Sequence, residues 1–277
     1  MNRAHEARSG ALAQFQVQSN AAERYERWVV PFVVGPWVPG LLDLAALRPG
    51  ERVLDVATGT GVVARLAVRQ VSPGGTVTGL DLNEAMLAEA RRLRLPPGLT
   101  VTWHQGSALA LPFIDGTYDV VLCQQGLQVF PDRAKGLGEM RRVLRSGGRV
   151  AVSVWTGPSP YFAAMREGLA RYVSPDAAIS GAAAFSLGDA AQLQELLTGS
   201  GFREVVVHHV RMTLRLPAPE DFLLRHLSAV PAADLVAAAG ADVHAALVTH
   251  MTEATRPYVD GYGLAVPQEV NVAIGSA

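Results

Sequence analysis

Between residues 51 and 155, two kinds of hydrophobic pattern alternate along the chain. Short apolar runs rich in β-branched residues are the first kind, and several are apolar on both faces, as strands covered by helices must be. We therefore predict strands at 51–57, 75–81, 99–104, 118–123 and 149–155.

Helix signals lie between these runs. Residues 60–71 follow a glycine turn, Asn83 is placed to cap the segment 84–95, and Asp132 is placed to cap the segment 133–146. Alternating strands and helices predict a Rossmann-like, doubly wound α/β sheet with right-handed crossovers.

The rest of the chain is more loosely patterned. A helix opened by Asp189, a long strand at 203–216 and a last strand at 265–275 are predicted, and the segments 156–185 and 217–263 read as helical. We find no internal repeat and no low-complexity linker, so residues 1–277 are expected to form one domain with two helical insertions.

Composition narrows the function classes. Of the 277 residues, 49% are hydrophobic and 18% are charged, with a formal net charge of −1, which indicates a globular chain without the basic excess that nucleic acids require. No uninterrupted apolar stretch of about 18 residues is present, so no membrane span is expected. The single cysteine, Cys123, cannot form an internal disulfide or a cysteine-rich zinc site and is expected in the core. No metal site is expected, and the N-terminus lacks a signal-peptide pattern, so a cytoplasmic location is expected by default.

The sequence Gly59-Thr60-Gly61-Val62-Val63-Ala64 fits the dinucleotide-binding pattern G-x-G-x-x-G/A, which alone can also mark a simple tight turn. Asp81 ends the next predicted strand, about 20 residues further on, where an acid can accept hydrogen bonds from both ribose hydroxyls. Together, the turn and the acid predict a nucleoside at the carboxyl ends of the strands.

Asp55 distinguishes between two nucleoside ligands. It precedes the turn, where NAD would place a pyrophosphate and S-adenosylmethionine (SAM) would place an ammonium and a sulfonium. Two charges about 4 Å apart interact by roughly 4 kcal/mol at an effective dielectric near 20, which is repulsive for the pyrophosphate and attractive for the cations. This favours SAM, although an Asp that only binds the backbone of the turn is an open alternative.

These motifs resemble those of the class I SAM-dependent methyltransferases, and most closely the ubiquinone/menaquinone biosynthesis group. Four blocks follow the order found in that family: VLDVATGTG, TGLDLNEAML, GSALALPFIDGTYDVVLCQQGLQVFPD and MRRVLRSGGRVAVSVW. The resemblance implies a seven-stranded sheet whose last strand is antiparallel, an N-terminal helical cap at 1–47, and lid insertions over the substrate at 156–185 and 217–263. It implies cofactor contacts from Asp55, Ala57, Thr58, Gly59, Gly61, Asp81, Leu82, Met86, Gly106, Ser107, Ala108 and Gln124. Ser107 stands where the family often has Asp.

No decisive general base is evident. The candidate catalytic residues are His226, in an apolar segment expected to pack over the cleft, Gln128, which the resemblance places with Gln125 near the methyl group or the substrate, and Tyr25, on the aromatic face of the predicted cap. We expect a methyltransferase for a small, largely apolar metabolite, with oxygen favoured as the acceptor atom and carbon or nitrogen possible. The alternatives are a SAM-binding protein with a cyclisation or structural role, and an NAD-dependent oxidoreductase. A monomer or a homodimer is expected.

Overall fold

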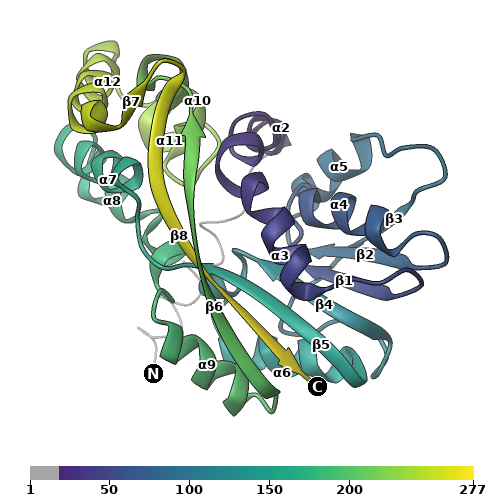
Figure 1. Ribbon diagram of the computed structural model, residues 1–277. Helices are drawn as coiled ribbons and strands as arrows, with labels where there is room; N and C mark the ends of the chain where they lie inside the picture. The colour runs from purple at the N-terminus through teal and green to yellow at the C-terminus, as the bar shows by residue number, and fades with distance from the viewer. Residues whose placement is uncertain (1–18) are drawn as a thin grey trace, which may run out of the picture.

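The computed structural model describes residues 19–277 and shows a twisted mixed sheet with helices on both faces (Figure 1). The strands lie in the order β3-β2-β1-β4-β5-β8-β6, and a short strand, β7, pairs with β8. Their bounds are Arg52–Val56 (β1), Thr76–Asp81 (β2), Val101–Gln105 (β3), Tyr118–Gln124 (β4), Leu144–Trp155 (β5), Arg203–Leu216 (β6), Val259–Asp260 (β7) and Gly263–Ser276 (β8).

Strands β1 to β5 are mutually parallel, and β8 runs antiparallel to both β5 and β6. The predicted doubly wound sheet with an antiparallel last strand is therefore confirmed, with β7 as a small addition. The strand order reverses between β1 and β4, which are neighbours in the middle part of the sheet. In open α/β sheets this switch point leaves a crevice at the carboxyl ends of the strands, where ligands bind.

Helices cover the two faces of the sheet and bury two hydrophobic clusters. One cluster includes Val63 and Ala67 of α4, and the other includes Leu137 of α6 and Leu193 of α9. The two predicted caps are confirmed, since the Asn83 side chain accepts from Ala85 N, and Asp132 accepts from Lys135 N. The helices on the sheet are Val38–Ala45 (α3), Val62–Val71 (α4), Glu84–Arg92 (α5), Arg133–Val143 (α6) and Ala190–Gly199 (α9), with a 3₁₀ turn at Leu127–Val129 (η3).

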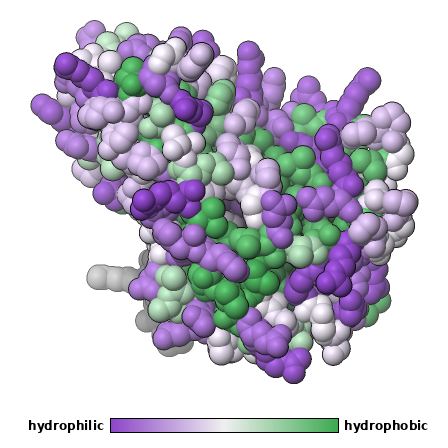
Figure 2. All heavy atoms as spheres, in the orientation of Figure 1, coloured by the Kyte–Doolittle hydropathy of each residue, from purple (hydrophilic) through white to green (hydrophobic). Residues whose placement is uncertain are grey.

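The two expected insertions are helical and lie together beyond one end of the sheet. The long strands β6 and β8 extend from the sheet to this group (Figure 1). The outward side of the group is largely hydrophilic, while apolar side chains gather in the middle of the visible face (Figure 2). We call this group the insertion helices: Pro160–Tyr172 (α7), Pro175–Ile179 (α8), Ala182–Phe185 (η4), Pro219–Leu227 (α10), Ala233–Ala237 (α11), Ala241–Thr255 (α12) and Arg256–Tyr258 (η5). That they act as a lid stays a prediction.

The N-terminal part of the described chain forms a continuous helical stretch, Ser19–Trp28 (α2), Val30–Val34 (η1), Gly35–Trp37 (η2) and α3. By length and composition its residues 21–45 could cross a membrane, but half of their most apolar window is buried inside the protein. Trp37 is only 3% exposed and Leu41 is 1% exposed, so this stretch belongs to the hydrophobic core. Residues 1–18 of the predicted cap lie outside the described residues.

Trp103 of β3 packs directly beneath the glycine turn that joins β1 to α4. A Cβ atom added to Gly61 would lie 2.2 Å from the Trp103 ring, and one added to Gly79 of β2 would lie 2.5 Å from it. Gly61 also has a φ of +84°, a left-handed conformation that glycine adopts without strain. Gly61 is thus required by packing as well as by backbone geometry.

Replacing Gly61 with alanine is therefore expected to destabilise the protein by about 2–4 kcal/mol, because backbone strain adds to a clash with Trp103. Gly98, with a φ of +83° and nothing within 4 Å of an added Cβ, is the matched control. Gly98→Ala is expected to cost only the strain, about 1 kcal/mol. Urea unfolding measures both variants, and equal losses would contradict the packing role of Trp103.

Candidate functional site

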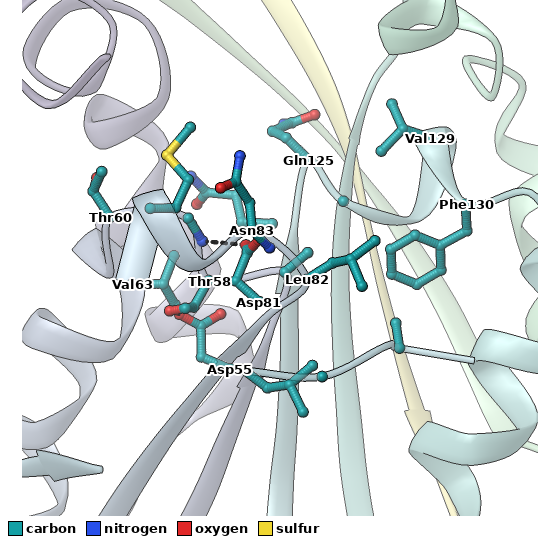
Figure 3. Close-up of a pocket in the computed structure, with 18 of the residues that line it drawn as sticks. Asp55, Thr58, Thr60, Val63, Asp81, Leu82, Asn83, Gln125, Val129 and Phe130 are labelled. Atoms are coloured by element: carbon teal, nitrogen blue, oxygen red, sulfur yellow. Dashed lines mark hydrogen bonds between the residues drawn. The ribbon is translucent and has the colours of Figure 1, made fainter. Parts of the chain in front are cut away.

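A cavity opens at the carboxyl ends of β1, β2 and β4, at the predicted switch point (Figure 3). It brings together the glycine turn, the end of β2, the loop after β3, the loop after β4 and one residue from α2. The residues that line it are Tyr25, Val34, Asp55, Ala57, Thr58, Gly59, Thr60, Val62, Val63, Leu80, Asp81, Leu82, Asn83, Met86, Gly106, Ser107, Ala108, Leu109, Gln124, Gln125, Gly126, Val129, Phe130 and Pro131.

The glycine turn forms one wall with its backbone. Ala57 and Gly59 have φ values of +58° and +56°, so the chain turns sharply after β1. A Cβ atom added to Gly59 would meet nothing within 4 Å, which means that the space above it belongs to the cavity. A ligand can therefore approach the backbone closely at Gly59, whereas the corresponding side of Gly61 faces Trp103 and Gly61 does not line the cavity; a cofactor contact at Gly61 stays a prediction.

Asp55 is the next-to-last residue of the apolar strand β1 and is almost completely buried, with 1% exposed. Its Oδ2 accepts from the Thr58 hydroxyl at 2.5 Å and from Ala64 N at 3.1 Å, so this carboxylate does bind the turn. Its Oδ1 accepts no hydrogen bond from any residue that the structure describes, and the residue lines the cavity. Burial raises the pKa of Asp55 to about 7, because the charged form has lost its hydration. Asp55 thus binds the turn with one oxygen, and its other oxygen is left for a ligand in the cavity; that it binds a cation stays a prediction.

Asp81 ends β2 beside the turn (Figure 3). Its Oδ2 accepts from Gly59 N at 2.8 Å, and its Oδ1 accepts from Asn83 N at 2.9 Å. Burial raises its pKa, against the lowering effect of these backbone donors. Each oxygen keeps a second lone pair, so the carboxylate is held in a fixed orientation and can still accept two more hydrogen bonds.

Asp55 and Asp81 are the only charged residues among those lining the cavity. The nearby Arg65 points elsewhere, since it donates to Thr60 O and pairs with Glu26 Oε1 at 2.7 Å. Glu26 in turn accepts from the Thr60 hydroxyl at 2.5 Å, which ties α2 to the glycine turn. The cavity is therefore an anionic site that attracts cations and repels a pyrophosphate.

Helix α4 begins at Val62 without a cap from the residue before it, Gly61, and its first turn faces the cavity. The Ala64 N–H of this turn donates to Asp55, and the preceding N–H groups, with the positive end of the helix dipole, can bind one small anionic group here.

The wall opposite the turn is mostly apolar. Leu82 and Met86 follow Asp81, Ala108 and Leu109 come from the loop after β3, and Phe130 comes from the loop after β4. Figure 3 shows Leu82 and Phe130 on the side of the cavity away from Thr60 and Val63, and apolar side chains of this kind can pack on a flat ring. Gly106 and Ser107 border the same region, and the Ser107 hydroxyl already accepts from Leu109 N at 3.1 Å.

Gln124 ends β4 and carries an unsatisfied acceptor. Its Nε2 donates to Val34 O at 2.9 Å, which fixes the amide, while its buried Oε1 has no hydrogen-bond partner within the described part of the chain. A buried acceptor without a partner costs about 1–3 kcal/mol, so a donor ligand at this position would be stabilising.

The three predicted catalytic residues lie in different surroundings. Tyr25 lines the cavity, and its pKa is raised by burial and by the charges of Asp81 and Glu26, so it remains a protonated donor. Gln128 lies behind the cavity wall, 2% exposed. His226 does not line the cavity either, and its catalytic role stays a prediction.

His226 is enclosed by the aromatic residues of the insertion helices. Its Nδ1 lies 3.0 Å from the Tyr161 hydroxyl, and its ring stacks on Phe222 at 5.2 Å. Burial lowers its pKa to about 4, so the imidazole is neutral and joins α7 to α10.

Several lining residues were not predicted. Thr60, Asn83, Leu109 and Phe130 lie inside the quoted blocks, where their closeness to predicted contacts was a usable signal. Val34 lies about 90 residues before its partner Gln124 in the sequence, and no local sequence pattern predicts that contact.

Comparison with known proteins agrees with this site. Residues 53–148 match the methyltransferase domain family. A demethylmenaquinone methyltransferase of Thermus thermophilus is 43% identical over 122 residues, 44% of this chain and 55% of that protein. A 2-phytyl-1,4-naphtoquinone methyltransferase of Synechococcus elongatus is 36% identical over 152 residues, 53% of this chain and 65% of that protein. The matches thus span less than two thirds of either relative.

Among solved structures, the phosphoethanolamine N-methyltransferase 2 of Haemonchus contortus, crystallised with S-adenosylhomocysteine, has a TM-score of 0.61 at 20% identity. The match covers 96% of this chain and 59% of that one. At this identity the likeness concerns the fold. Residues 53–148 therefore match a methyltransferase domain, and the described chain has the fold of this solved methyltransferase.

Proposed function

We propose that this protein transfers a methyl group from SAM to a small, largely apolar organic acceptor. The observation that carries the proposal is the cavity at the switch point, where the described lining residues include the buried carboxylate of Asp55, the half-buried carboxylate of Asp81 and no cationic side chain. SAM supplies the reaction with a methyl group on a positively charged sulfur, while the protein binds, orients and excludes water.

The residues present fit the amino acid end of SAM. The free Oδ1 of Asp55 and the unpartnered Oε1 of Gln124 offer two acceptors for its ammonium group. The first turn of α4 offers backbone donors for its carboxylate. Ala57, Thr58 and Gly59 would lie along the same part of the cofactor, where the absence of a Cβ at Gly59 leaves room.

The residues also fit the nucleoside end. The Asp81 carboxylate is held in place by the donors Gly59 N and Asn83 N, and each of its oxygens keeps one lone pair. These two lone pairs would accept from the two ribose hydroxyls. Leu82 and Met86 would pack on the adenine, with Gly106, Ser107 and Ala108 at its edge. Ser107 would contribute a weaker, neutral hydrogen bond than the carboxylate that the family often has there.

The acceptor is proposed to be apolar because no charged residue besides the two aspartates lines the described cavity. The names of the two relatives support an acceptor of the quinone-biosynthesis type, an apolar ring with oxygen substituents. The described lining residues include no histidine, lysine or cysteine, so an acceptor that is already acidic or electron-rich suits this site. Oxygen remains the acceptor atom that we favour.

Binding and turnover test this function separately. Calorimetric titration is expected to show binding of SAM and none of NAD. Incubation with SAM and 1,4-dihydroxynaphthalene, an apolar hydroquinone, is expected to release S-adenosylhomocysteine, with a methyl ether as the product by mass spectrometry and NMR. A ring-methylated product would move the acceptor atom to carbon, and binding of NAD in preference to SAM would overturn the proposal.

Replacing Asp81 with asparagine is expected to weaken SAM binding by roughly 1.5–3 kcal/mol, or about 10- to 150-fold, because hydrogen bonds to a charged acceptor are lost. Asp234→Asn, at an exposed position in α11, removes the same charge and is expected to leave the affinity unchanged. Calorimetry measures both. Equal affinities of the two variants would remove the ribose assignment.

The affinity for SAM is also expected to depend on pH through Asp55, whose pKa is raised to about 7 in the unliganded protein. Below that pKa the carboxyl is protonated, and a cation must displace the proton. Affinity should therefore rise roughly tenfold between pH 6 and pH 8 and then level off. Proton release, measured by calorimetry in two buffers, should accompany binding at pH 6. Asp55→Asn should bind weakly and without this pH dependence; a dependence that survives the substitution would assign it elsewhere.

A further inference from the structure

The loop after β4 holds one lining residue, Gln125, in an unusual backbone conformation. Its φ is +57°, which costs a residue other than glycine about 1 kcal/mol, and such outliers gather at functional sites. The next residue explains what holds it there. A Cβ atom added to Gly126 would lie 2.7 Å from Ala57 of the glycine turn and 2.9 Å from Cys123 Sγ. Gln125 is thus positioned by direct packing of its loop against the cofactor turn.

Two buried residues hold the side chain of Gln125 at the cavity wall. Its Oε1 accepts from Gln128 Nε2 at 2.9 Å, and its Nε2 donates to Ser153 Oγ at 3.3 Å. Gln128 is 2% exposed and Ser153 is 1% exposed, so neither reaches solvent. The backbone N of Gln125 also donates to Ser153 O at 2.8 Å. Both ends of the amide are therefore engaged from behind, while Gln125 itself lines the cavity.

The two partners differ in what they can specify. A serine hydroxyl can either donate or accept, so Ser153 would tolerate the amide in both orientations. Gln128 presents its NH₂ group, which can only donate, and so requires the oxygen of Gln125 to face it. Turning both amides together would reverse this arrangement, so the Gln125 amide can take only the orientation that the buried Gln128 amide allows. Gln128 is thus the residue that sets which end of the Gln125 amide points in which direction.

One N–H and one lone pair of the Gln125 amide remain uncommitted, because only one bond is made at each end. We propose that Gln125 binds a polar group of the methyl acceptor through this pair, and that Gln128 is a positioning residue that fixes the order of donor and acceptor. The inference rests on the proposed function, since it assigns the acceptor side of the same cavity. It also gives the neighbouring glutamines different proposed ligands, because Gln124 is proposed to bind the cofactor and Gln125 the acceptor.

Two variants that each delete one hydrogen bond to Gln125 distinguish orientation from simple support. Gln128→Met keeps the side-chain length but removes the donor, so the amide loses its fixed orientation. Ser153→Ala removes the partner that accepts either orientation of the Gln125 amide and keeps the hydrogen bond from Gln128. With 1,4-dihydroxynaphthalene, KM is expected to rise at least tenfold in Gln128→Met and in Gln125→Met, and less than threefold in Ser153→Ala. The affinity for S-adenosylhomocysteine should stay within twofold in all three.

Equal effects of Gln128→Met and Ser153→Ala, or an unchanged KM in Gln125→Met, would overturn the inference. If the wild type binds SAM but forms no product with this probe, the acceptor class is wrong. A second measurement then still tests whether Gln128 orients the Gln125 amide. In the protein loaded with S-adenosylhomocysteine, NMR of the Gln125 side-chain amide should show its protons next to Ser153. In Gln128→Met this contact should weaken as both orientations become populated, and an unchanged contact would exclude Gln128 as the orienting residue.

Discussion

The site depends on two carboxylates that the fold removes from water without supplying a cation. Asp55 and Asp81 lie at the carboxyl ends of neighbouring strands, and burial raises the pKa of both, with the charge of Asp81 adding to the effect on Asp55. Isolated charges are costly to bury, so such a pair is stabilised by hydrogen-bond donors and by a positive ligand. The donors come from the glycine turn itself, through Thr58 and Ala64 to Asp55 and through Gly59 to Asp81. The shape of the turn and the charge preference of the cavity thus have one origin.

The same turn connects the cofactor half of the protein with the insertion helices. Thr60 and Arg65 both bind Glu26 of α2, and Tyr25, the preceding residue, enters the cavity. On its other side α2 contacts α10, where Arg24 Nε donates to Ser228 O and the Arg225 guanidinium lies 4.7 Å from the Trp28 ring centroid. Helix α2 is therefore in contact with both parts, and a ligand beside Tyr25 and Thr60 touches the element that joins them.

The sheet and the cofactor wall were predictable because their signals are local. Each strand is a short apolar run, and the turn, Asp55 and Asp81 fall within about 30 residues, in an order that the fold converts directly into proximity. The finer roles were not predictable in the same way. Gly61 matches the ligand-binding pattern, yet it packs on Trp103, about 40 residues away, because β3 lies beside β2. The apolar segment around His226 was expected to pack over the cleft, but His226 does not line the cavity, and its aromatic partner Tyr161 comes from the other insertion, 65 residues earlier.

The part of the chain that matches its relatives is the part whose cavity contacts join residues close together in the sequence. The matched residues 53–148 contain the cofactor wall almost completely. The remaining polar contacts join distant segments: Gln124 with Val34, Gln125 with Ser153, and Arg24 with Ser228. The first and the last of these contacts involve the N-terminal helices, whereas Ser153 belongs to β5 of the sheet itself. On the proposed function, the packing of α2, η1 and the insertion helices would therefore affect the choice of acceptor, while Asp55 and Asp81 would keep the cofactor the same.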